Sequence, residues 1–123
     1  MTEFLDVNDV LHVVERFGFH VRDAGLLASA VARPSASVMG ADAYPSLDEK
    51  AAALLESFLR NHALFDGNKR TGWTAMVLFL WINGFRHDFS TDEAFGLVIS
   101  VAEGRIGVAE CARVIAAHRV ARG

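Results

Sequence analysis

The chain has 123 residues, 52% hydrophobic and 22% charged, which excludes a disordered chain and fits one domain over residues 1–123. A net charge of −3 argues against direct binding to nucleic acid, and a single cysteine excludes a disulfide framework. The acidic start is not a secretory signal, and the longest apolar run, residues 73–82, is too short to span a membrane. We therefore expect a cytoplasmic protein that does not contact a membrane.

Helical periodicity dominates the N-terminal third of the chain. An apolar stripe over residues 10–17 predicts a helix that Asp6 or Asn8 caps and Gly18 ends. Residues 24–32 predict a second helix, which the following proline stops.

A loop follows, and then the best-defined helix start of the sequence. Residues 34–45 are rich in serine, glycine and proline and form the longest predicted loop. One short hairpin is expected, either in this loop or near residues 85–89. Ser46 and Glu49 have the spacing of a capping box, so a helix begins there and runs towards His62.

The C-terminal half predicts three further helices. The first, from about Lys69 to Ile82, is apolar on all sides and is therefore expected at the centre of the domain. Ser90-Thr-Asp-Glu is a second capping box, whose helix runs to about Ala102. A last helix covers about Val108 to His118. The whole pattern predicts an all-α fold.

Two cations, Lys69 and Arg70, fall in the first turn of the predicted 69–82 helix. That end of a helix carries partial positive charge and free N–H groups, so acidic side chains are favoured there and cations are not. A bound anion compensates most simply, and a turn leading into a helix is a common phosphate site. Gly67 permits close backbone approach, and Asn68 either caps the helix or bonds a phosphate oxygen.

The neighbouring residues supply the other parts of a phosphoryl-transfer site. Asp66 lies beside the predicted anion, where a carboxylate is tolerated if Mg²⁺ lies between it and the phosphates. His62 is the natural general base near neutral pH. Arg60 is a weaker candidate for a further positive contact. A phosphate cradle, a metal and a group that positions the nucleophile are what phosphoryl transfer requires.

Each of these residues also has an ordinary structural explanation. A histidine near a helix end is commonly a cap, Asp-Gly-Asn is commonly only a turn, and a Lys-Arg pair is commonly solvated. Their combination within nine residues, between two well-defined helices, is what favours a site. By contrast, Trp73, Phe79 and Trp81 are expected in the core, and Cys111 is expected to be a small buried hydrophobe.

Residues 62–71, His-Ala-Leu-Phe-Asp-Gly-Asn-Lys-Arg-Thr, resemble the signature of the Fic/Doc (Fido) family, His-x-Phe-x-Asp/Glu-Gly/Ala-Asn-Gly/Lys-Arg. The resemblance covers almost the whole chain and is closest to the Doc (death on curing) toxins of toxin–antitoxin pairs. It implies a compact bundle of about six helices around a central apolar helix. It also implies that His62 is the catalytic base, that Asp66 holds Mg²⁺, and that residues 67–70 bind the phosphates of ATP.

Two positions of the motif determine what this resemblance implies. Leu64 stands where the family has its anchoring phenylalanine, and Phe65 follows it, so either side chain is able to fill that space. Lys69 stands where most Fic proteins, which transfer AMP, have glycine. Doc proteins have lysine and bind the nucleotide reversed, and a lysine does add bulk and charge to an open phosphate nest. The resemblance therefore implies a kinase acting on a protein threonine or serine, with elongation factor Tu as target and translation arrest as outcome.

The resemblance also implies how the activity is inhibited. Many Fic proteins silence themselves with a helix bearing Ser/Thr-x-x-x-Glu-Gly/Asn, and the nearest string here, residues 100–104, is one residue too short. An antitoxin of the Phd type, bound over the active-site groove, is therefore the implied inhibitor. Residues 34–45 are our candidate for a flap that positions the target.

Three alternatives stay open at this point. One is AMP transfer by the same residues in the same fold. Another is a non-catalytic module that recognises only an antitoxin or a nucleotide, against which the intact His62 and Asp66 speak. The third is a housekeeping modifier outside any toxin system.

Overall fold

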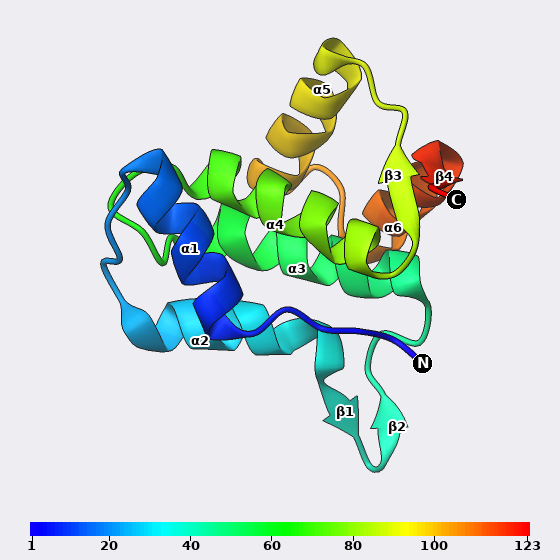
Figure 1. Ribbon diagram of the computed structural model, residues 1–123. Coiled ribbons are helices and arrows are strands. Elements are labelled where there is room, and N and C mark those ends of the chain that lie inside the picture. Colours follow the sequence, from blue (N-terminus) through cyan, green and yellow to red (C-terminus); the bar gives the residue numbers. More distant parts are fainter.

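The computed structural model describes residues 1–123 as six α-helices with two small antiparallel strand pairs (Figure 1). The helices are α1 (Val7–Phe17), α2 (Ala24–Ala32), α3 (Leu47–Asn61), α4 (Asn68–Ile82), α5 (Thr91–Ala102) and α6 (Val108–His118), with a 3₁₀ turn at Arg33–Ser35. The predicted all-α class is confirmed. No helix combines the length and the apolar character that crossing a bilayer demands.

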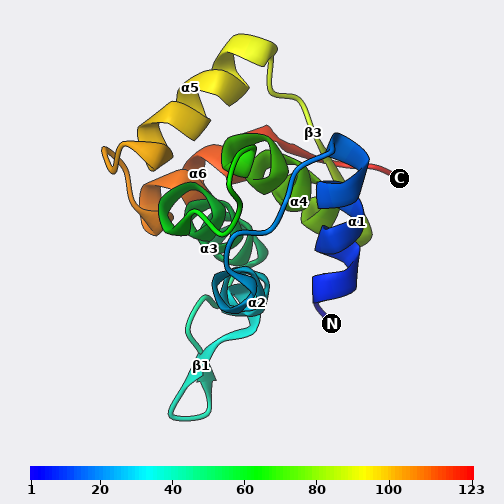
Figure 2. The same ribbon diagram turned by 90° about the vertical axis from the view of Figure 1, so that its left-hand side faces the viewer.

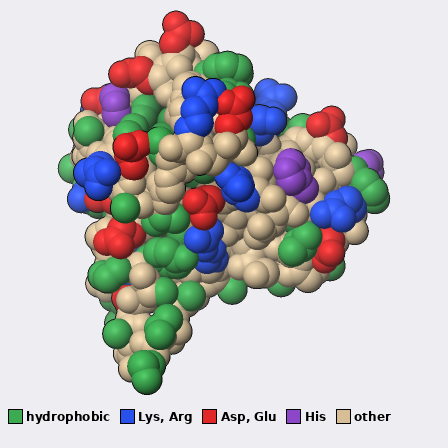
Figure 3. All heavy atoms as spheres, turned by 180° about the vertical axis from the view of Figure 1, so that it is seen from behind, with side chains coloured by type: hydrophobic (Ala, Val, Ile, Leu, Met, Phe, Trp, Pro, Cys, Tyr) green, Lys and Arg blue, Asp and Glu red, His purple; other side chains and the backbone are tan.

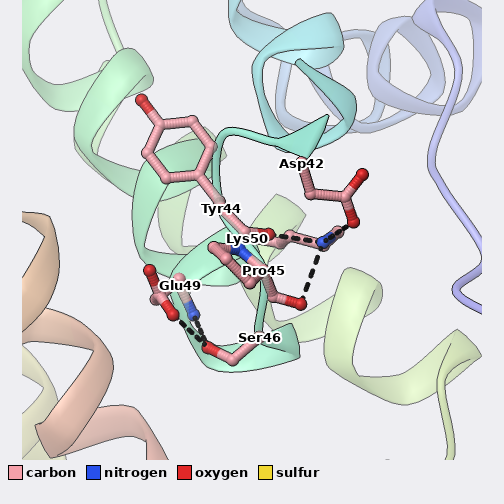
Figure 4. A network of polar contacts seen from close by, with 6 residues as sticks. All are labelled: Asp42, Tyr44, Pro45, Ser46, Glu49 and Lys50. Carbon is pink, nitrogen blue, oxygen red and sulfur yellow. Dashed lines mark hydrogen bonds and ion pairs between the residues drawn. The ribbon is translucent and has the colours of Figure 1, made fainter. Parts of the chain in front are cut away.

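Local capping chemistry sets where the helices begin and end. Asp6, not Asn8, caps α1, and its carboxylate accepts the backbone N–H three residues on at 2.8 Å. Gly18 ends that helix in the left-handed conformation, with φ 76°. Ser46 caps α3 as predicted, accepting the Glu49 N–H at 3.0 Å, but the Glu49 carboxylate accepts the Ser46 hydroxyl instead of its backbone N–H (Figure 4).

The centre of the bundle is α3, which contacts α2, α4, α5 and α6. Figure 2 shows it surrounded by those helices. Ten of its fifteen residues are buried, and one continuous core takes side chains from all six helices. The expectation that the 69–82 helix is central was wrong: only six of the fifteen residues of α4 are buried.

The apolar outer side of α4 explains that error. Phe79 is buried as expected and Trp73 half-buried, but Trp81, also expected in the core, is 49% exposed. Residues of α1 and α4 line a groove of about 660 Å³ between them, so the outer side of α4 is only partly covered. A helix that is apolar on all sides need not be surrounded by protein.

The two strand pairs differ in how far they reach along the chain. β1 (Ser37–Val38) and β2 (Ala41–Asp42) form a hairpin within the predicted loop. β3 (Phe85–His87) pairs instead with β4 (Arg119–Ala121), the strand that directly follows α6. No strand pattern was recognised after α6, so this second pairing was not predicted.

A buried lysine fixes the base of the hairpin to α3. Lys50 is 3% exposed, and its ammonium group donates to the carboxylate of Asp42 at 3.1 Å (Figure 4). It also donates to the carbonyl of Tyr44 and, at 3.3 Å, to that of Pro45. Three acceptors therefore meet at one buried charge, which is how a buried ammonium group is stabilised.

Candidate active site

The loop over residues 62–67 returns the chain from the C-terminal end of α3 to the N-terminal end of α4 (Figure 1). It encloses a cavity of about 390 Å³ together with the last turn of α3 and the first turn of α4. The lining residues are Leu59, His62, Phe65, Asp66, Gly67, Asn68, Lys69 and Arg70. Six of the seven residues proposed from the sequence therefore lie around one cavity.

The seventh, Arg60, lies elsewhere. Its guanidinium group packs against Gly104 in the turn after α5, where a Cβ on Gly104 would come within 2.3 Å of Arg60 Nη1. Two residues along a helix amount to a rotation of about 200°, so Arg60 and His62 point to opposite sides of α3. The structure thus keeps Arg60 away from the cavity.

His62 ends α3 in an unusual backbone conformation. Its φ of 51° and ψ of 55° are left-handed, and it is one of two non-glycine residues with positive φ. That conformation costs about 1–2 kcal/mol for an L-residue. Strain of this kind persists only where surrounding contacts enforce it, and it is concentrated at functional sites. The turn at His62 takes the chain out of the helix and leaves the side chain exposed at the cavity.

The enforcing contacts come from residues 20–23, which run antiparallel to residues 62–65. The carbonyl of Ala63 accepts two N–H groups from the end of that segment, at 2.8 and 3.0 Å. The N–H of Phe65 donates to the carbonyl of His20 at 3.1 Å. No motif or spacing in the sequence linked residues 20–23 to residues 62–65. This brace of the loop, formed by residues 20–23, was therefore not predicted.

Leu64 takes the anchoring position of the motif. It is 1% exposed and belongs to the core, whereas Phe65 is 72% exposed and lies at the wall of the cavity. Of the two side chains expected to fill the family's phenylalanine space, it is therefore the leucine that is buried.

Position 67 requires glycine for two reasons, its left-handed backbone conformation and the lack of space for a Cβ. Its φ is 81°, a left-handed value, and it forms the N-cap of α4. A Cβ on Gly67 would lie 2.2 Å from the ring of Phe19. A close approach to the backbone of Gly67 was expected, and the group that makes it is the ring of Phe19.

Asn68 orders the loop through its side chain. Its amide oxygen accepts the Leu64 N–H at 3.0 Å and its amide nitrogen donates to the Leu64 carbonyl at 3.0 Å. The expectation that Asn68 caps the helix was wrong, because Gly67 is the cap and Asn68 is the first helical residue. With its amide engaged on both sides, Asn68 can offer an anion its backbone N–H.

The first turn of α4 retains the positive character inferred from the sequence. No side chain caps it and no acidic residue lies in it, whereas side chains cap α1, α2, α3 and α5; α6 also lacks such a cap. Lys69 and Arg70 are exposed at the cavity, and the Arg70 guanidinium lies over the Phe17 ring, 4.8 Å from its centre. Free N–H groups and two cations thus face one space.

Asp66 is the acidic member of the cavity. One of its oxygens accepts the Gly67 N–H at 2.8 Å, and the other has no protein partner. No group of three or more histidine, cysteine or acidic residues could hold a metal by itself. A single carboxylate that shares Mg²⁺ with bound phosphates is a common arrangement, and the hard oxygen donor of Asp66 fits that cation.

The hairpin does not reach this cavity. It is attached at the N-terminal end of α3, and His62 follows the C-terminal end, about 22 Å away along fifteen residues of helix. Figures 1 and 2 show the hairpin projecting away from the loop, and Figure 3 shows apolar side chains gathered over it. No residue of 34–45 lines the cavity, so the flap hypothesis has no support from the geometry.

Comparison with known proteins gives two matches. The model of the Fic/DOC family matches residues 2–80, which include the loop and its brace. The chain is also 57% identical over 107 residues to a protein named Toxin Doc from Mycolicibacterium smegmatis (strain ATCC 700084 / mc(2)155). That alignment covers 83% of this chain and 82% of the relative.

Proposed function

The chain belongs to the Fic/DOC family, and we propose that it is the toxin of a toxin–antitoxin pair. We further propose that it transfers the γ-phosphate of ATP to a serine or threonine hydroxyl of a protein. The toxin role is supported by the 57% identity to a relative named Toxin Doc. The observation that carries the transfer is the convergence of His62, Asp66, Lys69 and Arg70 on one cavity at the start of α4, which no side chain caps.

The residues divide the reaction between them. His62 accepts the proton of the target hydroxyl as its oxygen forms a bond to the γ-phosphorus. The bond from that phosphorus to the bridging oxygen breaks, and ADP leaves with the electron pair. Lys69, Arg70 and the free N–H groups of α4 bind the phosphates. Mg²⁺ held by Asp66 would neutralise charge on the phosphate oxygens when bound.

The side chain of Lys69 is what favours phosphate transfer over AMP transfer. It lies at the cavity in the first helical turn, where glycine would leave backbone N–H groups more open to phosphate. AMP transfer by the same residues is the alternative, and the position of the label in labelled ATP separates the two. The proposed target, elongation factor Tu in the cytoplasm, rests on the family resemblance alone.

Inhibition is proposed to occur in trans, by an antitoxin of the Phd type over the cavity. Residues 100–104, the nearest match to a self-inhibitory motif, lie at the end of α5 and its following turn, and none lines the cavity. Glu103 is engaged in an ion pair with Arg105. A small antitoxin reading frame beside this gene is therefore expected.

Growth arrest tests the proposed function. Expression of the chain without an antitoxin is expected to arrest bacterial growth, and His62→Ala is expected to abolish the arrest. His12→Ala is the matched control, since His12 is an exposed histidine of α1 outside the cavity. Arrest that persists in His62→Ala would instead support a non-catalytic binding module. If expression of the chain produces no arrest, the toxin assignment is wrong.

A further inference from the structure

Arg22 makes a two-pronged contact with the histidine at the cavity. Its Nε and Nη2 both donate to the carbonyl oxygen of His62, at 2.9 and 2.6 Å. The two residues are 40 positions apart in the sequence. Arg22 does not line the cavity, so its contact with the site runs through the backbone of His62.

The contact falls on the strained residue. His62 ends α3, and the last carbonyl groups of a helix have no helical N–H to accept, so the carbonyl of His62 depends on a donor from elsewhere. A planar guanidinium group presents two parallel N–H donors to that oxygen and therefore fixes both its position and its direction.

Arg22 is itself held in place from the same side. Its backbone N–H donates to the carbonyl of Ala63 at 2.8 Å, so its main chain and its side chain grip two successive peptide groups. The peptide between His62 and Ala63 cannot rotate without breaking one of these contacts. A return of His62 to a right-handed φ would also carry its carbonyl oxygen away from Arg22, so this contact helps to hold the left-handed conformation.

We infer that Arg22 is a positioning residue for His62. By fixing the carbonyl of His62 it fixes the backbone angles from which the imidazole projects, and so keeps the ring at the cavity. The catalytic consequence rests on the proposed function, whereas the effect on the conformation of His62 does not. A lysine at position 22 keeps the charge but offers a single point donor instead of a fork.

Kinetics separate positioning from ligand binding. Arg22→Lys is expected to lower kcat by roughly 10- to 100-fold, because small displacements of a catalytic group have effects of that size. The KM values for ATP and for the protein target are expected to stay near those of the wild type. Arg113→Lys is the matched control, because Arg113 is an exposed arginine of α6 far from the site. The kcat of this variant is expected to equal that of the wild type. An unchanged kcat in Arg22→Lys, or a raised KM for ATP alone, would overturn the inference.

Spectroscopy tests the inference without reference to activity. In Arg22→Lys the NMR signals of the His62 ring and the Ala63 amide are expected to shift or split, while those of the His118 ring stay in place. Unaltered His62 signals would contradict a positioning role even if kcat fell. If the wild type transfers no phosphate or AMP, the proposed function fails but this comparison still stands.

A measurement on the wild-type protein tests the same contact without requiring that a variant folds. The Nε–H proton of Arg22 is expected to exchange slowly with solvent because it is engaged with His62. The Nε–H of Arg113 is the internal reference. Equal exchange at the two arginines would show that the fork does not persist in solution and would refute the inference.

Discussion

The ring of Phe19 lies where a side chain on Gly67 would be: a Cβ there would come within 2.2 Å of the ring atoms Cδ2 and Cε2. This contact joins the turn after α1 to the cap of α4, the helix whose first turn lines the cavity. The site is therefore built from two stretches, the motif loop and the segment that precedes α2. The second stretch gives the loop its shape and supplies no group to the cavity wall.

Gly67→Ala tests that contact. We expect a loss of at least about 2 kcal/mol in the free energy of unfolding, because the variant combines a left-handed backbone with a clash. Gly96→Ala is the control, since Gly96 lies in α5 with open space around its Cβ, and a gain of about 0.5–1 kcal/mol is expected there. Urea unfolding measures both. Equal effects in the two variants would contradict the account.

The roles of Leu64 and Phe65 are separable by truncation. Leu64→Ala is expected to cost about 2–5 kcal/mol in the free energy of unfolding, as for other large-to-small core changes. Phe65→Ala is expected to stay within about 0.5 kcal/mol of the wild type, because most of the ring is exposed. Denaturant titration of both variants decides this. A larger loss for Phe65→Ala would mean that the aromatic residue is the anchor.

Lys50→Met removes the charge that fixes the hairpin. The Asp42 carboxylate and the two carbonyl oxygens lose their donor, so amide hydrogen exchange in residues 37–45 is expected to speed up. Exchange in α4 is expected to be unaffected, since the hairpin lies at the other end of α3 from the cavity. Transfer activity is expected to stay at the wild-type level. A loss of activity without a loss of stability would revive the flap hypothesis.

The thiol of Cys111 gives the fold a dependence on alkaline pH. Burial raises the pKa of this thiol to about 12, with a smaller contribution from the charge of Glu56. In the unfolded chain the thiol releases its proton near the ordinary pKa of about 8.5. The contribution of the buried, protonated thiol to the free energy of unfolding is therefore complete below that pH. It is lost progressively as the pH rises towards 12. Stability curves of the wild type and Cys111→Ala are expected to converge over this range, and parallel curves would contradict the assignment.

Much of the helical framework follows from local chemistry. The bounds of α2 match the expectation because Pro34 acts on its own neighbours. The centre of the bundle could not be predicted in this way. Asp48 and Lys50 are buried charges that make α3 look solvated in the sequence, and the partner of Asp48 is Arg119, 2.7 Å away but far along the chain.

The same distinction applies to the candidate site. His62, Asp66 and Lys69 are close in the sequence, so a turn between two helices is enough to gather them at one cavity. Arg22 and Phe19 reach the loop from more than one helix away, and only the tertiary fold shows it. Arg60 illustrates the converse, because a neighbour in sequence can lie on the opposite side of a helix.

The destination of the label in radioactive ATP distinguishes phosphate transfer from AMP transfer. The purified chain is incubated with γ-labelled or α-labelled ATP, Mg²⁺ and a bacterial lysate, with His62→Ala in parallel. We expect a protein of the lysate to acquire the γ-label on threonine or serine, and His62→Ala to abolish this labelling. Transfer of the α-label would show AMP transfer instead, and γ-labelling that survives in His62→Ala would contradict the role of that residue.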